Sequence, residues 1–266
     1  MFGAAMTYVM LSRVQSLSQL FILDSVPAEK FYADFKALEE LERLEKVSRN
    51  RNPSSWESNT STLKISSLNC QSLLKKIIHI REDLILAKSD VICLSETWLT
   101  TSSLSEDIDL DGYKLALNSV GAGRGLATYY RENLFQHTAN ITNHLYQLTK
   151  ISSENIDIIS VYRSPNSHQI IIQESLFELI DEQKPTIICG DFNICFEKNR
   201  NSRLIKGLEE KGFRQLNNDA THYLGGHIDH VYSNKEFNVK VTLYSPYYCA
   251  KDHDGLLIEM KNVTGN

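Results

Sequence analysis

The stretch "TIICGDFNIC", residues 186–195, joins an apolar run to a glycine and then to two polar side chains two residues apart. The run from Thr186 to Cys189 is typical of a strand that is buried on both faces. Because side chains alternate along an extended backbone, Asp191 and Asn193 should point the same way just beyond the strand. We therefore expect a carboxylate and a carboxamide to share one task at the end of a buried strand.

Apolar runs of strand length recur along the chain, and several come in consecutive pairs with no helix between them. The expected strands cover residues 63–69, 90–96, 112–118, 125–131, 156–163, 186–191, 227–233, 237–245 and 255–260. The expected helices cover residues 72–87, 168–183 and 203–211. Paired strands with few helices disfavour a doubly wound parallel sheet. They predict an α/β protein with two mixed sheets packed face to face and helices outside.

The chain divides into two blocks of different character. Residues 48–62, "SRNRNPSSWESNTST", are polar and contain a proline, which is typical of a linker. The block before it, residues 1–47, holds an expected amphipathic helix over 28–47 but too few apolar residues for a stable domain. The block after it, residues 63–262, is long enough to bury a core of its own.

Composition sets only loose limits on function. The 266 residues are 42% hydrophobic and 23% charged, as in ordinary globular proteins. The net charge of −5 neither indicates nor excludes a nucleic-acid partner, because an enzyme acting on DNA needs only a local basic rim. The five cysteines include no CxxC pair, and the default is a reducing, intracellular compartment. No apolar run approaches 18 residues, so we expect no membrane span.

Polar side chains end or follow the apolar runs at six places. Each alone has a structural reading, such as a turn cap or a core tyrosine with a wet hydroxyl. Together they supply acid, amide, phenol and imidazole groups, which suit phosphodiester hydrolysis. These residues are Asn69, Glu96, Tyr162, Asp191 with Asn193, Asp229, and Asp252 with His253.

A phosphodiester is an anion that is shielded from nucleophiles, so its hydrolysis needs a divalent cation near the phosphate oxygens. A hard cation such as Mg2+ prefers one or two carboxylates, and Glu96 and Asp252 are candidates. An acceptor must also hold the attacking water, a task that Asp191 and Asn193 can share.

The phosphate itself needs a hydrogen-bond donor. His253 suits this role, because a charged imidazole donates from both ring nitrogens. Asp229 could fix the tautomer of that imidazole and favour its charged form. The residues thus predict an acceptor for water and a cationic donor for phosphate in one site.

The motifs that carry these residues resemble, in order, those of the endonuclease/exonuclease/phosphatase superfamily. They are "LKISSLNCQSL", "DVICLSETWL", "GRGLATYYREN", "SVYRSPN", "IICGDFN", "HIDHVYSN" and "KDHDGLLIEM". In particular they resemble the apurinic-endonuclease-like domains of non-LTR retrotransposons. The resemblance covers residues 63–261.

The resemblance implies a four-layer α/β sandwich with a Mg2+-dependent site at one end of the two sheets, where Mn2+ is a possible substitute. It implies that Asn69, Glu96 and Asp252 lie at the metal. It also implies that Tyr162 contacts the phosphate and that His253 faces it. The implied partner is DNA.

The same resemblance implies that Asp191 and Asn193 position and activate the attacking water and that Asp229 pairs with His253. Two positions depart from the family pattern. Gln71 stands where many relatives have an aspartate, which leaves one fewer anionic ligand, and Lys251 replaces a usual serine. Because no matched catalytic position is lost, we expect an active enzyme.

The first block has a resemblance of its own. "TYVMLSRVQSLSQLFIL" followed by "ALEELERL" resembles the C-terminal end of Pif1-type DNA helicases, including those of Helitron transposons. In such helicases the arginine of this motif, here Arg13, reaches the ATP γ-phosphate. The chain contains no GxxxxGK[ST], so we expect neither ATPase activity nor a nucleotide cofactor. The alternative is an ordinary amphipathic extension.

Two other groups of residues carry less weight. His222, His227 and His230 lie close together in sequence, but without thiolates they are a weak zinc signal. A set of basic residues could form either a solvated face or a phosphate-contacting rim. They are Lys75, Lys76, Arg81, Arg124, Arg131 and Arg163.

Three hypotheses for the function stay open at this point. The first is a DNA-nicking endonuclease of mobile-element origin, acting as a monomer and in the nucleus. The second is a phosphomonoesterase or lipid phosphodiesterase on the same scaffold. The third is a non-catalytic DNA-binding relic. The retroelement-like motifs and the helicase resemblance favour the first.

Overall fold

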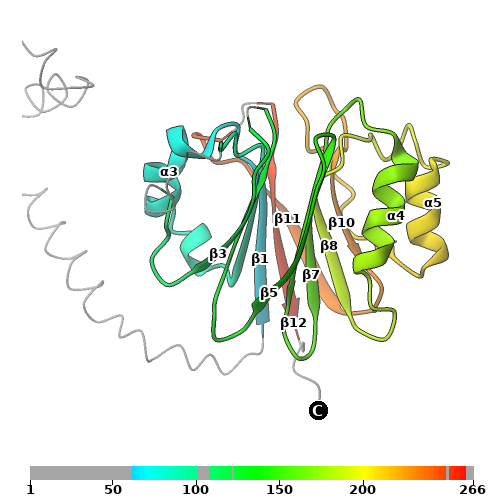
Figure 1. Ribbon diagram of the computed structural model, residues 1–266, viewed down its shortest axis with the longest axis horizontal. Helices are drawn as coiled ribbons and strands as arrows, with labels where there is room; N and C mark the ends of the chain where they lie inside the picture. Colours follow the sequence, from blue (N-terminus) through cyan, green and yellow to red (C-terminus); the bar gives the residue numbers. More distant parts are fainter. Residues whose placement is uncertain (1–61, 101–107, 122, 250–251, 262–266) are drawn as a thin grey trace, which may run out of the picture. The chain divides into compact units, whose positions relative to one another are not determined.

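A computed structural model describes residues 62–100, 108–121, 123–249 and 252–261 of the chain (Figure 1). The helicase-like block 1–47 with Arg13, its expected helix over 28–47, and the expected linker up to residue 61 lie outside the described residues. Lys251 lies outside them as well.

Two mixed sheets form the centre of the fold. The strands of the first span Thr62–Asn69 (β1), Val91–Ser95 (β2), Lys114–Asn118 (β3), Leu126–Tyr130 (β4), Asn238–Tyr244 (β11) and Gly255–Lys261 (β12). Those of the second span Gln136–Thr142 (β5), Tyr146–Ser152 (β6), Asp157–Arg163 (β7), Thr186–Asp191 (β8), Arg214–Gln215 (β9) and Asp229–Ser233 (β10). The strand orders are β11-β12-β1-β2-β4-β3 and β5-β6-β7-β8-β10-β9.

Each sheet contains one parallel pair, β1 with β2 and β7 with β8. A parallel pair needs a crossover, which here carries a helix. The helix α3 (Leu73–Glu82) follows β1, α4 (Gln169–Leu179) follows β7, and α5 (Arg203–Glu210) follows β8. Figure 1 shows α3 outside the first sheet and α4 with α5 outside the second. The fold is therefore the four-layer α/β sandwich that the sequence analysis predicted.

Apolar side chains fill the space between the two sheets. Ile65 and Cys93 from the first sheet belong to the same buried cluster as Ile158 and Cys189 from the second. The Cys93 and Cys189 sulfur atoms lie 3.8 Å apart, and both residues are free thiols. These cysteines act as small apolar side chains in the core. Separate apolar clusters bury the inner faces of the helices against each sheet.

The hairpin of β5 and β6 was missed by the sequence analysis. The β5 strand lies at a sheet edge and alternates only between exposed and half-buried positions, so it has no apolar run. The β6 strand is buried, but two of its buried side chains are the polar Gln147 and Thr149. The Gln147 carboxamide oxygen accepts the Gly125 N–H over 3.1 Å, which satisfies it inside the fold.

The helix expected over residues 72–87 is shorter in the structure. The α3 helix ends at Glu82, and a 3₁₀ turn, η4 (Leu86–Lys88), follows. The Asp83 carboxylate causes the break, because it accepts the N–H groups of Ile85 (2.8 Å) and Leu86 (3.0 Å). No helix in the described part of the chain is long and apolar enough to cross a membrane.

Asp157 at the start of β7 predicts a pH-dependent stability. Its buried carboxylate lies 2.6 Å from the Lys150 ammonium and 2.7 Å from the Lys184 ammonium. Burial opposes ionisation, but the bonds from both lysines outweigh it and lower the pKa of Asp157. Because the folded pKa is depressed, this stabilisation is complete above the unfolded pKa of about 4 and is lost as pH falls through the folded value.

We expect Asp157→Asn to lower the free energy of unfolding by about 2 kcal/mol at pH 7, because the two lysines lose their partner. The difference from the wild type should shrink below about pH 4. Urea denaturation of the full chain at several pH values measures both effects. Asp219→Asn, at an exposed position, is the control and should change little at any pH. Equal loss at all pH values would contradict the ion-pair explanation.

Candidate active site

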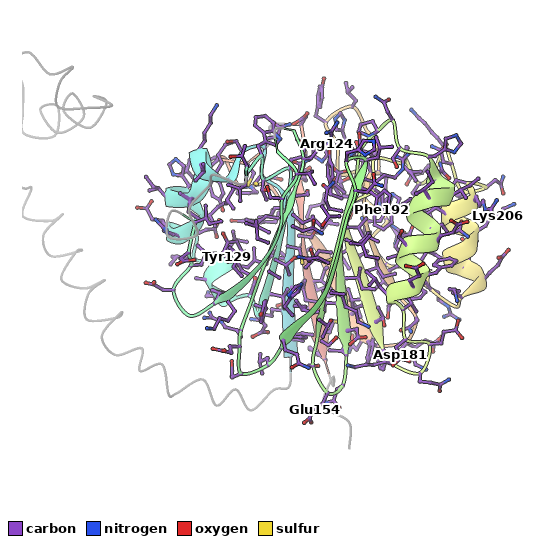
Figure 2. All side chains as sticks on the ribbon, in the orientation of Figure 1. Arg124, Tyr129, Glu154, Asp181, Phe192 and Lys206 are labelled. Atoms are coloured by element: carbon purple, nitrogen blue, oxygen red, sulfur yellow. The ribbon has the colours of Figure 1, made fainter. Side chains whose placement is uncertain are left out.

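The C-terminal ends of the two parallel strand pairs meet at one edge of the sandwich. Asn69 ends β1, Asp191 ends β8, and the Asn69 carboxamide nitrogen donates to the Asp191 carboxylate over 3.0 Å. The first sheet and the second sheet therefore contribute to one site. Figure 2 shows Arg124, which precedes β4, at this upper edge, and Glu154 at the opposite end of the sheets.

Asp191 is fully buried at the centre of the site. One carboxylate oxygen accepts the Asn193 N–H over 3.0 Å, and the other accepts from Asn69. Burial, together with the negative charge of Asp229, raises the pKa of Asp191 well above its ordinary value. The preceding Gly190 has φ +141°, and a Cβ there would lie 2.0 Å from the Val161 carbonyl oxygen. Only glycine allows β8 to run this close to β7 just before the aspartate.

Asn193 is half-buried and adopts the left-handed conformation, with φ +48°. Its carboxamide nitrogen donates to the Arg163 carbonyl oxygen over 2.8 Å. One amide hydrogen is thus committed to the backbone, and the side chain is held beside Asp191. The sequence analysis predicts that Asp191 and Asn193 hold one water. Asn193 would contact that water through its carboxamide oxygen.

His253 and Asp229 form a buried pair. The His253 Nδ1 lies 3.0 Å from an Asp229 carboxylate oxygen, and both side chains are 7% exposed. Burial disfavours the charged imidazole, but the bond to Asp229 and the charges of Asp191 and Asp252 outweigh it and raise the pKa of His253 to about 9. The site therefore contains a cationic hydrogen-bond donor at neutral pH.

Glu96 follows β2 in the left-handed conformation, with φ +52°. Its carboxylate accepts the indole N–H of Trp98 over 3.3 Å. Burial raises the pKa of Glu96, while hydrogen bonding by Asn69 and the charge of His253 oppose the shift. The charge of Glu96 in turn helps to raise the pKa of Asp191 at the end of β8, so Glu96 also lies near the second sheet.

Asp252 and Asn69 are connected through Gln71. The Gln71 carboxamide nitrogen donates to the Asp252 carboxylate over 3.1 Å, and its backbone N–H donates to the Asn69 side-chain oxygen over 3.2 Å. The position that lacks the expected aspartate thus supplies a neutral donor that orients one of the predicted metal ligands.

The side chains fit a hard divalent cation by their chemistry, since Glu96 and Asp252 offer carboxylates and Asn69 an amide oxygen. Among the described residues, two groups of acidic and histidine side chains have ligand atoms within 4.8 Å of one another. These are Asp191 with Asp229 and His253, and His222 with Asp252 and His253. Glu96 is in neither group, but the charge of Asp252 contributes to its raised pKa, so the two carboxylates act on each other at this edge.

Tyr162 near the end of β7 is buried and donates its hydroxyl to the Gly123 carbonyl oxygen over 3.0 Å. Burial and the charges of Glu96 and Asp191 raise its pKa, so the phenol keeps its proton. The glycine-rich turn that contains Gly123 joins β3 to β4. This turn also accepts a hydrogen bond from the segment after β2, because the backbone N–H of Trp98 donates to the Arg124 carbonyl oxygen over 2.8 Å.

Hydrogen bonds and charge interactions thus bring together all the side chains that the sequence analysis selected. They are Asn69, Glu96, Tyr162, Asp191, Asn193, Asp229, Asp252 and His253. Their assignment to catalysis or to metal binding stays a prediction.

The sequence left open whether six basic residues form a solvated face or a phosphate-contacting rim, and two of them bind within the fold instead. Arg163 is only 5% exposed, and its guanidinium donates to backbone carbonyl groups. Arg131 stacks on the Tyr113 ring at 3.8 Å and donates to the carbonyl oxygens of Gly112 and Ala87. Both arginines hold local structure.

The three clustered histidines do not form one site. His230 is fully buried and bonds the Tyr232 hydroxyl (2.9 Å) and the Ile194 carbonyl oxygen (2.8 Å). Burial lowers its pKa to about 3, so it is a neutral core residue. His227 pairs with Glu197. Only His222 lies at the active-site edge, with its ring centroid 5.3 Å from that of His253.

Four residues at the site were not selected from the sequence for the place that they occupy: Gln71, Trp98, Arg163 and His222. Gln71 carried a signal, since it departs from the family pattern. The other three gave none, because their partners at the site depend on contacts across the fold.

Comparisons with known proteins agree with this fold. An AP endonuclease from Archaeoglobus fulgidus superposes with a TM-score of 0.61 at 18% identity, over 74% of this chain and 98% of the other. The endonuclease domain of TRAS1, a telomere-specific non-LTR retrotransposon, gives 0.58 at 13%, over 75% and 98%. The 3′ phosphatase NExo from Neisseria, bound to a product DNA hairpin, gives 0.57 at 15%, over 75% and 99%. No curated protein matches the chain.

These likenesses establish the fold. The family is established by sequence, because the model of one family matches residues 66–249, more than half of the chain. That span begins in β1 and contains the strand ends that carry Asn69, Glu96, Tyr162, Asp191 and Asp229. The chain belongs to the Endonuclease/Exonuclease/phosphatase family, whose members are hydrolases acting on phosphodiester bonds.

Proposed function

We propose that this chain is a Mg2+-dependent phosphodiester hydrolase that cuts one strand of DNA. The observation that carries the proposal is the buried Asp229–His253 pair, which keeps a cationic donor beside Asp191. Hydrolysis of an anionic diester requires positive charge facing the phosphate and an acceptor for the proton of water. This edge of the fold offers both.

In this proposal Asp191 accepts the proton of the attacking water. Its raised pKa brings the carboxylate closer to the range in which a base takes up a proton near neutral pH. Asn193 orients the same water through its carboxamide oxygen. His253, charged through Asp229, donates to a non-bridging phosphate oxygen and stabilises the charge that develops there.

Glu96, Asn69 and Asp252 would hold a Mg2+ ion, for which Mn2+ can substitute. When bound, the ion would neutralise phosphate oxygens and support the leaving alkoxide. Gln71 orients Asp252 but adds no negative charge, so the cation would be held by two carboxylates, the Asn69 amide oxygen and bound waters. The Tyr162 hydroxyl would exchange its bond to Gly123 for one to the phosphate.

DNA from mobile elements is the substrate context that the motifs support best. The retroelement-like "SETWL" and "VYRSPN" and the helicase-like first block both favour it. A retrotransposon endonuclease domain and a protein bound to a DNA hairpin are among the proteins of similar fold. We propose that the protein acts as a monomer in the nucleus. The phosphatase among its structural relatives makes removal of a terminal phosphate the second candidate.

The full chain should convert supercoiled plasmid to open circles in the presence of Mg2+ and not in EDTA. Asp191→Ala and His253→Ala should each reduce the nicking rate by about 10²- to 10⁴-fold, because the first removes the acceptor for the proton of water and the second removes a charged hydrogen-bond donor to the phosphate. Gel electrophoresis of the plasmid measures the rate.

Asp219→Ala, at an exposed position, should nick at the wild-type rate. Release of phosphate from a 3′-phosphorylated oligonucleotide without plasmid nicking would favour the phosphatase. A folded wild-type chain that binds DNA but performs neither reaction would identify a relic.

Trp98 provides a direct test of the metal site, because the chain has two tryptophans and Trp98 donates to Glu96. In a Trp56→Phe chain, Mn2+ bound at Glu96 should quench the Trp98 fluorescence, since a paramagnetic ion quenches a nearby fluorophore. Mg2+ should reverse the quenching by competition. Adding Glu96→Gln should weaken the apparent affinity about tenfold or more.

Glu154→Gln is the matched control, because Glu154 lies at the opposite end of the sheets (Figure 2). It should leave the quenching curve unchanged. Equal quenching in the Glu96→Gln and Glu154→Gln chains would show that Glu96 does not hold the ion.

A further inference from the structure

Arg163, the last residue of β7, buries a guanidinium group next to the active site. One terminal nitrogen donates to the carbonyl oxygens of Phe192 and Asn193, each over 3.2 Å. The other donates to the carbonyl oxygens of Ser167 and, over 3.5 Å, Pro165. The side chain therefore joins the turn after β7 to the turn after β8.

The burial of this charge needs an explanation. Among the described residues no carboxylate forms a direct ion pair with Arg163; its positive charge interacts with that of Asp191, and its terminal nitrogens bond backbone carbonyl groups. Burying a charge is costly even where an opposite charge lies nearby. A neutral core side chain could fill the same space, as apolar residues do elsewhere along β7. This cost is explained if the guanidinium of Arg163 has a function that an apolar side chain cannot perform.

The contact between the two turns is reciprocal. While the Arg163 side chain holds the Phe192 and Asn193 carbonyl groups, the Asn193 side chain donates to the Arg163 carbonyl oxygen over 2.8 Å. Asn193 has a left-handed backbone, and its N–H is bonded to the Asp191 carboxylate. Arg163 thus acts on the residue that orients Asp191. Its chain neighbour is Tyr162.

We propose that Arg163 is a positioning residue, which holds the Asp191–Asn193 turn and the Tyr162 end of β7 in fixed register for hydrolysis. The proposal rests on the proposed function. The planar guanidinium carries several N–H groups and can bind two chain segments at once. A lysine ammonium has all its N–H groups on one nitrogen at the end of a flexible side chain. The residue therefore acts through its geometry, without contacting the substrate.

The test compares Arg163→Lys and Arg163→Met with the wild type in the full chain. We expect kcat for plasmid nicking to fall about 10-fold in Arg163→Lys and more in Arg163→Met, with KM changed less than about 3-fold, because the turn loses its geometry and not its substrate contacts. Hydrogen exchange of peptides covering residues 191–196 should become faster in both variants, since the Phe192 and Asn193 amides are hydrogen-bonded in the ordered turn.

Arg131→Lys and Arg131→Met are the matched controls. Arg131 also donates to two backbone carbonyl groups, but it follows the far end of β4, next to the start of β2. These variants should lower the melting temperature without changing kcat or the exchange of residues 191–196. If Arg163→Met does not fold, Arg163→Lys carries the comparison.

Three results would overturn the proposal. Loss of stability in the Arg163 variants with unchanged kcat would make the residue merely structural. A rise in KM of tenfold or more with unchanged kcat would make it a phosphate contact. If the wild type does not nick DNA, the proposed function fails, and the exchange measurement alone decides: unchanged exchange over residues 191–196 would then refute the positioning role.

Discussion

The hydrogen bond between Asn69 and Asp191 is the constraint on which the site depends. It joins the last residue of β1 in one sheet to the last residue of β8 in the other, and both side chains are buried. The contacts between the sheets below it are mostly apolar, and such contacts have no preferred direction. A buried hydrogen bond does have one, and leaving either partner unsatisfied costs about 1–3 kcal/mol. It therefore sets how the two strand ends face each other.

Backbone strain gathers at the same edge. In the described chain, the non-glycine residues with positive φ are Gln71, Ser72, Glu96, Trp98 and Asn193. Each lies within three residues of the end of β1, β2 or β8. Left-handed backbone is unfavourable for all of these residue types except asparagine, and it persists where the surroundings hold it in place. The chain turns sharply after these strands, and the turns direct carboxylates and carboxamides toward the candidate site.

Some of this arrangement could be predicted from sequence, and the reasons differ from residue to residue. Asp191 follows a continuous apolar run and a glycine, so its place at the end of a buried strand had few alternatives. The β6 strand was missed because Gln147 is buried and satisfied by a turn over twenty residues away. Arg163 has the sequence pattern of a surface cation, and its burial depends on carbonyl groups about thirty residues further along the chain. Local patterns predict elements, whereas such distant partners become visible only in the fold.

The position of β12 has a consequence for how this protein is made. The strand lies between β11 and β1, although it comes last of the described strands, and Lys261 at its end pairs with Thr62 at the start of β1. During synthesis one edge of β1 therefore stays unpaired until residues 255–261 have left the ribosome. Asp252 and His253 arrive just before that strand. A nascent chain thus carries an exposed edge open to wrong pairing, and its candidate site residues come together only when the first sheet closes.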